Sequence, residues 1–193
     1  MFIRDWKKDV FTIPNFLSLF RLVLIPVYMF LYMNATDPRQ YYTAGGILAI
    51  SCLTDAIDGK IARHYHMIST LGKILDPLAD KITQFTLTLC LSMKYPHLNP
   101  VLILFITKEL FQLAVGIAHF RKGKMLPGAL PAGKVCTTVL FVSLISLVLF
   151  PALPAFWVDS IAVTDTIFLI ISFISYIQAY FGKQPKVMDL DDP

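Results

Sequence analysis

Four aspartates lie close together in a part of the sequence that is otherwise apolar. Asp55 and Asp58 are three positions apart and Asp76 and Asp80 are four apart, so each pair shares one face if its segment is helical. A hairpin centred on residue 67 brings Asp58 opposite Asp76 and Asp55 almost opposite Asp80. Ionisable groups at membrane depth are costly and are usually retained for function. We therefore expect four carboxylates to converge on one functional site.

The chemistry of these side chains favours a metal site. Carboxylates that converge within a few ångströms repel one another unless protons or cations neutralise them. Ligands that are all oxygen suit hard cations such as Mg²⁺ or Mn²⁺. The sequence has no cluster of Cys and His that competes as a zinc site, and its three cysteines all fall in apolar segments, where they behave as small hydrophobic residues.

Small residues and an arginine follow the first aspartate pair. Gly59 and Ala62 come one and four positions after Asp58, which leaves a strip of helix without bulky side chains. A nucleotide or phosphate can approach the backbone there. Arg63 lies one turn after Gly59, and its guanidinium suits a diphosphate. Close helix packing is the alternative explanation for Gly59 alone.

The composition predicts a membrane protein. Of 193 residues, 56% are hydrophobic and 16% are charged, and the mean hydropathy is +0.64, which does not fit a soluble domain. We expect an all-α, polytopic membrane protein that forms a single domain over residues 1–193. Six apolar segments have about the 20 residues that a transmembrane helix needs. These segments are Asn15–Met33, Tyr41–Arg63, Leu71–Met93, Leu98–His119, Lys134–Ala152 and Ile161–Tyr180.

The first ten residues combine an apolar stripe with charged residues. This pattern predicts a short N-terminal interfacial helix on the inner leaflet. The alternative is a signal peptide with residues 16–33 as its core. That run is long for a signal core, and no clear site with small residues for cleavage follows it.

The basic residues are unevenly distributed between the two ends of the expected spans. Twelve lie on the side of the termini and the aspartate hairpin, and two, Arg39 and Lys94, lie on the other side. The excess predicts an integral, multi-pass membrane protein with both termini and the aspartate site in the cytoplasm. The net charge of +4 is explained by this topology and by attraction to anionic membrane lipids, so it does not indicate nucleic acid.

Three classes of function remain for the aspartate hairpin. A cation transporter also uses buried carboxylates, but it usually holds them near the midplane on interrupted helices. A purely structural role, with ion pairs to nearby lysines and arginines, does not explain four aspartates on converging faces. An enzyme that uses metal and acts on a phosphate at the level of the lipid head groups explains the most features.

These residues resemble a known family. The pattern Asp55-x2-Asp58-Gly59-x2-Ala62-Arg63-x8-Gly72-x3-Asp76-x3-Asp80 matches every fixed position of the motif of CDP-alcohol phosphatidyltransferases. The resemblance also covers the length, the six spans, and Ile13-Pro14-Asn15 followed by Arg21 and Pro26. The stretch LGKILDPLADK is most similar to the branch that contains phosphatidylglycerophosphate synthases and eukaryotic-type cardiolipin synthases.

The resemblance implies a role for each aspartate. The family positions that match Asp55, Asp58 and Asp76 bind two divalent cations, Mg²⁺ or Mn²⁺. The position that matches Asp80 contacts metal and also serves as the general base.

The resemblance also implies a site for CDP-diacylglycerol. The family's small residues at the positions of Gly59, Ala62 and Gly72 admit the cytidine nucleotide, and the arginine at the position of Arg63 contacts the diphosphate. Asn15 is expected near the nucleotide, or alternatively as a helix cap after Pro14.

The implied reaction transfers a phosphatidyl group from CDP-diacylglycerol to an alcohol and releases CMP. Glycerol 3-phosphate is the expected acceptor, with Lys108 and Lys134 as ligands of its phosphate. The family's phosphatidylglycerophosphate synthases often carry Arg-Glu and a second arginine in the fourth span, whereas this chain has Lys108-Glu109 and no second arginine. A cardiolipin synthase that uses phosphatidylglycerol is therefore the alternative. Members of the family are often dimeric, so a homodimer is also expected.

Overall fold

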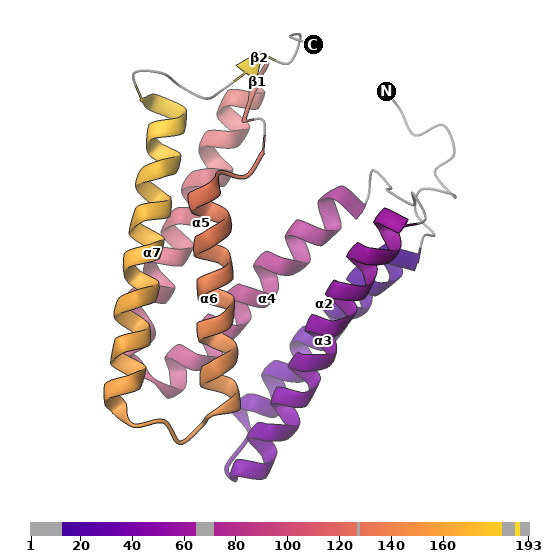
Figure 1. Ribbon diagram of the computed structural model, residues 1–193, viewed down its shortest axis with the longest axis vertical. Helices are drawn as coiled ribbons and strands as arrows, with labels where there is room; N and C mark the ends of the chain where they lie inside the picture. The colour runs from indigo at the N-terminus through magenta and orange to yellow at the C-terminus, as the bar shows by residue number, and fades with distance from the viewer. Residues whose placement is uncertain (1–12, 65–71, 127, 183–187, 190–193) are drawn as a thin grey trace. The chain divides into compact units, whose positions relative to one another are not determined.

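The chain folds into long helices at the positions where the sequence predicts them. The computed structural model describes residues 13–64, 72–126, 128–182 and 188–189, and it omits the side chains of residues 13–14, 38, 52–53, 55–64, 72–76, 125 and 188–189. Its long helices are α2 (Ile13–Met33), α3 (Pro38–His64), α4 (Gly72–Lys94), α5 (Asn99–Phe120), α6 (Pro131–Leu149) and α7 (Ala155–Phe181), with a short 3-10 helix η1 (Pro96–Leu98) before α5. Each of the six expected apolar segments falls on one of these helices (Figure 1).

Four segments in the described part of the chain are long and apolar enough to cross a membrane. They are Asn15–Met33, Pro96–Phe120, Pro131–Leu149 and Ala155–Phe181. The helices α3 and α4 are as long as the others, but they carry the aspartate motif and its neighbouring charges, which lower their mean hydropathy. The expected N-terminal interfacial helix lies outside the described residues.

The described chain forms two compact units. The first contains α2, α3, α4 as far as Cys90, and the segment Val148–Pro151. In this unit α2 packs along α3 (Figure 1). The buried face of α2 carries Asn15, Ser18, Arg21, Ile25 and Tyr28, which recur at the helical spacing of three or four residues. Its exposed face carries large apolar side chains suited to lipid, among them Phe16, Phe20, Val23 and Phe30.

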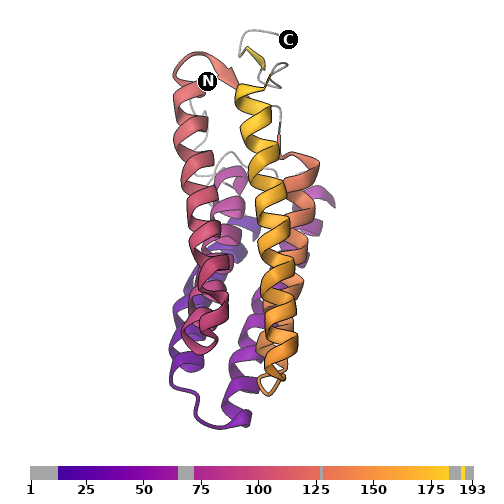
Figure 2. The same cartoon turned by 90° about the vertical axis from the view of Figure 1, so that its left-hand side faces the viewer.

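The second unit contains the rest of the chain, including α5, α6 and α7. The helices α5 and α7 lie side by side (Figure 2). Buried residues recur along α7 at alternating intervals of four and three, which is the spacing of a helix that packs lengthwise against a partner. These residues are Val158, Ala162, Asp165, Leu169, Ser172, Tyr176 and Ala179.

A short pair of strands ties the end of the second unit to the connection after α5. The strand β1 (Lys124–Met125) pairs antiparallel with β2 (Met188–Asp189). Gly123 makes the turn between α5 and β1 with a φ of 73°, a backbone conformation that glycine adopts without steric cost.

Candidate functional site

The aspartate motif occupies the end of one helix and the start of the next. Asp55 and Asp58 lie in the last three turns of α3, and Asp76 and Asp80 lie in the first three turns of α4. The small residues and the arginine of the motif, Gly59, Ala62, Arg63 and Gly72, lie on the same two stretches of helix. Within the motif, the structure describes the side chain of Asp80, and the other motif side chains lie outside the described residues.

Asp80 is held by a buried arginine from another helix. Nη1 of Arg21, on α2, donates a hydrogen bond to Oδ1 of Asp80 at 2.6 Å. The Arg21 side chain is 3% exposed, whereas that of Asp80 is 47% exposed. The ion pair thus joins a covered cation to a carboxylate that is open to its surroundings.

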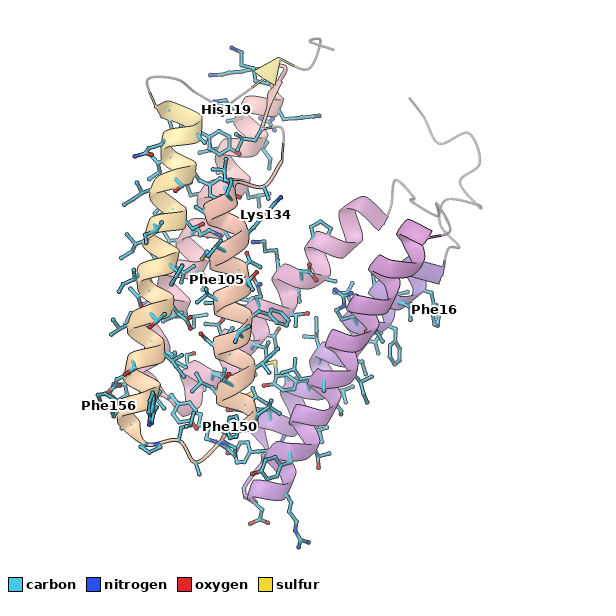
Figure 3. The ribbon with its side chains drawn as sticks, in the orientation of Figure 1. Phe16, Phe105, His119, Lys134, Phe150 and Phe156 are labelled. Carbon is cyan, nitrogen blue, oxygen red and sulfur yellow. The ribbon has the colours of Figure 1, made fainter. Side chains whose placement is uncertain are left out.

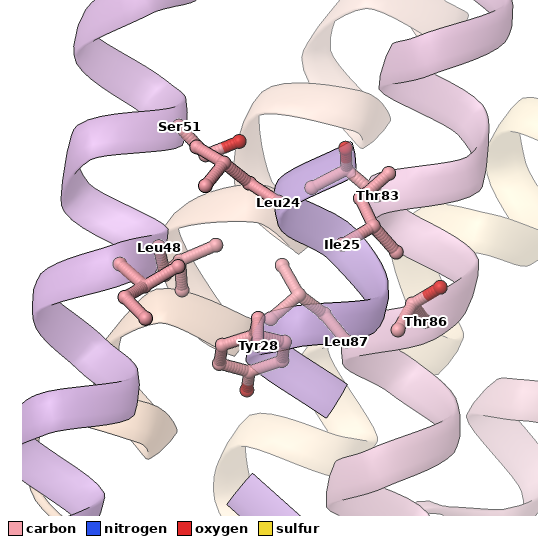
Figure 4. Close-up of a pocket in the computed structure, with 9 residues that line it drawn as sticks. Leu24, Ile25, Tyr28, Leu48, Ser51, Thr83, Thr86 and Leu87 are labelled. Atoms are coloured by element: carbon pink, nitrogen blue, oxygen red, sulfur yellow. The ribbon is translucent and has the colours of Figure 1, made fainter. Parts of the chain in front are cut away.

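Side chains of α3 and α4 next to the motif line a common cavity. Ser51 is one turn before Asp55 on α3, and Thr83 is three residues after Asp80 on α4, and both line one apolar cavity (Figure 4). Leu48 and Thr86 line the same cavity, and each of these two pairs is centred on residue 67. Residues of α3 and α4 thus lie on the wall of one cavity about one turn from the motif, whereas the expected pairing of the aspartates involves side chains outside the described residues.

The cavity itself offers little polar chemistry. Leu24, Ile25 and Tyr28 of α2 complete its wall (Figure 4). The hydroxyl of Thr83 donates to the carbonyl oxygen of Ala79 at 2.8 Å, within its own helix. The cavity is therefore a mainly apolar space bordered by α2, α3 and α4.

Asn15 is buried and lies within the first turn of α2. The helix begins at Ile13, two residues earlier. Its position inside the helix does not match the expected cap after Pro14, and it is buried, as Arg21 is.

The second unit holds the two lysines that the sequence assigns to the acceptor. Lys108 on α5 is buried, and its Nζ contacts Oε1 of Glu109 at 2.7 Å. The same Nζ lies 5.8 Å from the centre of the Tyr176 ring, which is the range of a cation–π contact. Lys108 is therefore stabilised by a carboxylate and by an aromatic face from α7.

Lys134 directly follows Gly133, a residue that packs on the same tyrosine. Gly133 packs so closely on Tyr176 that a methyl group at Gly133 would lie 2.6 Å from the tyrosine oxygen. Lys134 is exposed and projects from the first turn of α6 (Figure 3). Three basic residues of the connection between α5 and α6 are exposed as well: Arg121, Lys122 and Lys124.

Two residues of the second unit were not singled out by the sequence. Tyr176 contacts both Lys108 and Gly133 at the start of α6. In the sequence it cannot be distinguished from other aromatic residues of the apolar segments. Asp165 on α7 is 1% exposed, and an aspartate in the middle of an apolar segment was a visible signal. Ser143 of α6 is near enough to interact with this carboxyl group. Neither oxygen makes a hydrogen bond of good geometry within the part of the chain that the structure describes.

Comparisons with known proteins agree with the motif. The family model of the CDP-alcohol phosphatidyltransferases matches residues 11–178, which confirms the resemblance. A relative from Streptomyces coelicolor, named cardiolipin synthase (CMP-forming), is 33% identical over 133 residues, which are 66% of this chain and 60% of the relative.

Two other relatives carry names with a different acceptor. A probable phosphatidylglycerophosphate synthase from Mycobacterium tuberculosis is 32% identical over 61% of this chain and 57% of its own length. A CDP-diacylglycerol–glycerol-3-phosphate 3-phosphatidyltransferase from Aquifex aeolicus is 32% identical over 69% of this chain and 74% of its own length. The chain spans less than two thirds of the length of the first two of these three relatives.

The close packing of Gly133 on Tyr176 should make the protein sensitive to a larger residue at position 133. We expect Gly133→Ala to lower the midpoint of thermal unfolding in detergent, because the added methyl group overpacks the tyrosine and such strain costs about 1–3 kcal/mol. Adding Tyr176→Phe to this variant removes the closest contact and should restore part of the loss.

The matched control is Gly46→Ala on α3, where a methyl group meets nothing within 4 Å. It should be neutral or stabilising by up to about 1 kcal/mol, since alanine favours a helix more than glycine does. Equal midpoints for the two alanine variants would contradict the close packing at Gly133.

Proposed function

Because the chain belongs to the CDP-alcohol phosphatidyltransferase family, we propose that it transfers a phosphatidyl group from CDP-diacylglycerol to an alcohol and releases CMP. The observation that carries the proposal is the complete eight-residue motif on the end of α3 and the start of α4. Such a transferase acts in phospholipid biosynthesis and needs a site at the level of the head groups.

The donor site is proposed to use the small residues and the arginine of the motif. Gly59, Ala62 and Gly72 would let the cytidine nucleotide approach the helix backbones. Arg63 would bind the diphosphate, since a guanidinium matches two phosphate oxygens at once. Asn15, which is buried on α2, would lie near the nucleotide.

The aspartates are proposed to hold two divalent cations. Four carboxylates form an oxygen-only donor set of the kind that Mg²⁺ and Mn²⁺ prefer, and their spacing on the end of α3 and the start of α4 supports their convergence. Among the side chains that the structure describes, no three Asp, Glu, His or Cys residues cluster, since three of these four aspartates lie outside that set. When bound, such cations supply charge stabilisation for the diphosphate and for the departing CMP.

The reaction we propose is a direct displacement. The hydroxyl oxygen of the acceptor forms a bond to the phosphorus attached to diacylglycerol while the bond from that phosphorus to the oxygen of CMP breaks. Asp80 accepts the proton of the hydroxyl, which is too weakly acidic to ionise alone near neutral pH. CMP leaves with the electron pair of the broken bond.

The acceptor we propose is glycerol 3-phosphate, with Lys108 and Lys134 as ligands of its phosphate. Two ammonium groups suit a dianion, and the exposed Lys134 is accessible to it. Its product would be phosphatidylglycerophosphate. Cardiolipin synthesis from phosphatidylglycerol remains the second candidate, since the relatives include a cardiolipin synthase and Lys108 already has Glu109 as a partner.

The proposed membrane arrangement follows from the helices and the charges. We propose one membrane domain over residues 1–193 in which α3 and α4 also cross the bilayer, giving six spans. The excess of basic residues on one side puts both termini and the active site in the cytoplasm. A homodimer is proposed from the family alone.

Removing divalent cations should abolish activity. We expect purified protein in detergent to release no CMP from CDP-diacylglycerol in excess chelator and to recover with added Mg²⁺ or Mn²⁺. The measurement is CMP release with glycerol 3-phosphate present. Full activity in chelator would contradict the metal site, and ion flux in sealed vesicles without any CMP would favour a transporter.

Replacing the proposed base should reduce turnover more than binding. Asp80→Asn keeps the shape of the side chain but cannot accept the proton, so kcat should fall by at least about a hundredfold. Binding of CDP-diacylglycerol should survive better than in Asp55→Asn or Asp58→Asn. Asp37→Asn makes the same chemical change in the exposed connection between α2 and α3 and should leave kcat unchanged. Near-normal kcat in Asp80→Asn would assign the base to another residue.

An acceptor panel should identify the product. With labelled CDP-diacylglycerol, we expect mass spectrometry to detect phosphatidylglycerophosphate from glycerol 3-phosphate. Lys108→Ala should raise KM for glycerol 3-phosphate by about tenfold or more, because a hydrogen bond to a charged group contributes about 1.5–3 kcal/mol. Lys94→Ala is the control and should leave KM unchanged. Cardiolipin as the product from phosphatidylglycerol, with glycerol 3-phosphate ignored, would establish the alternative.

A further inference from the structure

Arg21 is a charged side chain in the interior of a membrane-spanning helix. It is the ninth residue of α2 and lies on the buried face of this helix, with 3% of its side chain exposed. A charge in such a place is costly unless another charge or a set of hydrogen bonds compensates it. The ion pair with Asp80 supplies this compensation.

The two partners differ in what they can reach. The guanidinium of Arg21 is covered, so a substrate in the site cannot contact it without a rearrangement of α2. Asp80 is about half exposed, so its carboxylate is accessible while Oδ1 accepts the hydrogen bond from Arg21. Asp80 is therefore an accessible group through which the covered Arg21 can act on the reaction.

We infer that Arg21 is a positioning residue that fixes the direction of the Asp80 carboxylate toward the acceptor hydroxyl, an inference that rests on the proposed function. The terminal torsion of an aspartate has a broad energy minimum, so the carboxylate plane needs an external partner to hold it. A charge-assisted hydrogen bond of 2.6 Å is short and strongly directional.

The surroundings of Arg21 give this contact a rigid base. One turn further along α2, Leu24 and Ile25 line the cavity of the first unit together with Thr83 and Leu87 of α4 (Figure 4). Ser18, one turn before Arg21, is fully buried. Side chains that lie on packed helices hold a catalytic group more accurately than side chains on loops.

Substitutions of Arg21 should lower kcat in a defined order. Arg21→Met keeps the length of the side chain but removes the charge and the donors, and kcat should fall by up to about a hundredfold, the loss expected when a reacting group is misplaced by about 1 Å. Arg21→Lys keeps a charge without the planar guanidinium, so its kcat should lie between those of Arg21→Met and the unmodified protein. KM for CDP-diacylglycerol should stay within about twofold in both variants.

A double-mutant comparison tests whether Arg21 acts through Asp80. Adding Arg21→Met to Asp80→Asn should cause no further loss of kcat, because the residue through which the arginine acts is already disabled. Kinetics of CMP release are measured together with binding of CDP-diacylglycerol and the midpoint of thermal unfolding. Thr88→Ala is the control for stability, since Thr88 is buried on α4 two turns beyond Asp80 and should leave kcat within about twofold.

The alternatives give different results. A lower midpoint with normal kcat in both Arg21 variants would make Arg21 purely structural and overturn the inference. A raised KM with normal kcat would make it a substrate ligand, and a full additional loss of kcat in the double variant would make it independent of Asp80. If Arg21→Met does not fold, Arg21→Lys alone decides, and an unchanged kcat there overturns the inference. Absence of CMP release by the unmodified protein would instead overturn the proposed function itself.

Discussion

A charged side chain within a lipid-facing helix must find its partner inside the protein, and this requirement governs both compact units. In the first unit Arg21 pairs with Asp80 across two helices. In the second, Lys108 contacts Glu109 and lies over the ring of Tyr176. Water that would compensate these charges in a soluble protein is absent from the bilayer core, so the fold must bring the partners together.

The same requirement explains the polarity of the helices. On α2 the polar residues Asn15, Ser18 and Arg21 face the protein, whereas phenylalanines such as Phe16 and Phe30 face outwards. This order is the reverse of that in a soluble helix, because lipid solvates apolar side chains as well as a protein interior does. On α2 this buried face carries Arg21, which meets Asp80 of α4. Asp80 illustrates the result, since its partner is covered while its own carboxylate stays open.

The residues that we propose for the acceptor lie in the second unit, whereas the motif proposed for the donor lies in the first. Relatives named as cardiolipin synthase and as phosphatidylglycerophosphate synthase both match this chain at 32–33% identity. If they share the donor and the metals, as the family motif implies, their acceptors must be distinguished by residues outside the motif. In this chain Lys108, Tyr176 and Gly133 at the start of α6 form a connected group, and we propose that it contributes to this distinction.

The sequence by itself determined the family, the positions of the long helices and the residues of the aspartate motif. It could do so because an apolar segment of transmembrane length and a fixed spacing on a helix face are local properties. The register of α3 against α4 at the motif stays a prediction, because three of the four aspartate side chains lie outside the described residues. The number of spans was less certain, because charges in α3 and α4 weaken the hydropathy signal where function needs them.

Only the tertiary structure decided that Arg21 pairs with Asp80, 59 positions away, and that Tyr176 lies against Lys108 and Gly133. These contacts join distant segments through the packing of whole helices, and neither composition nor spacing along one helix specifies which side chains then meet.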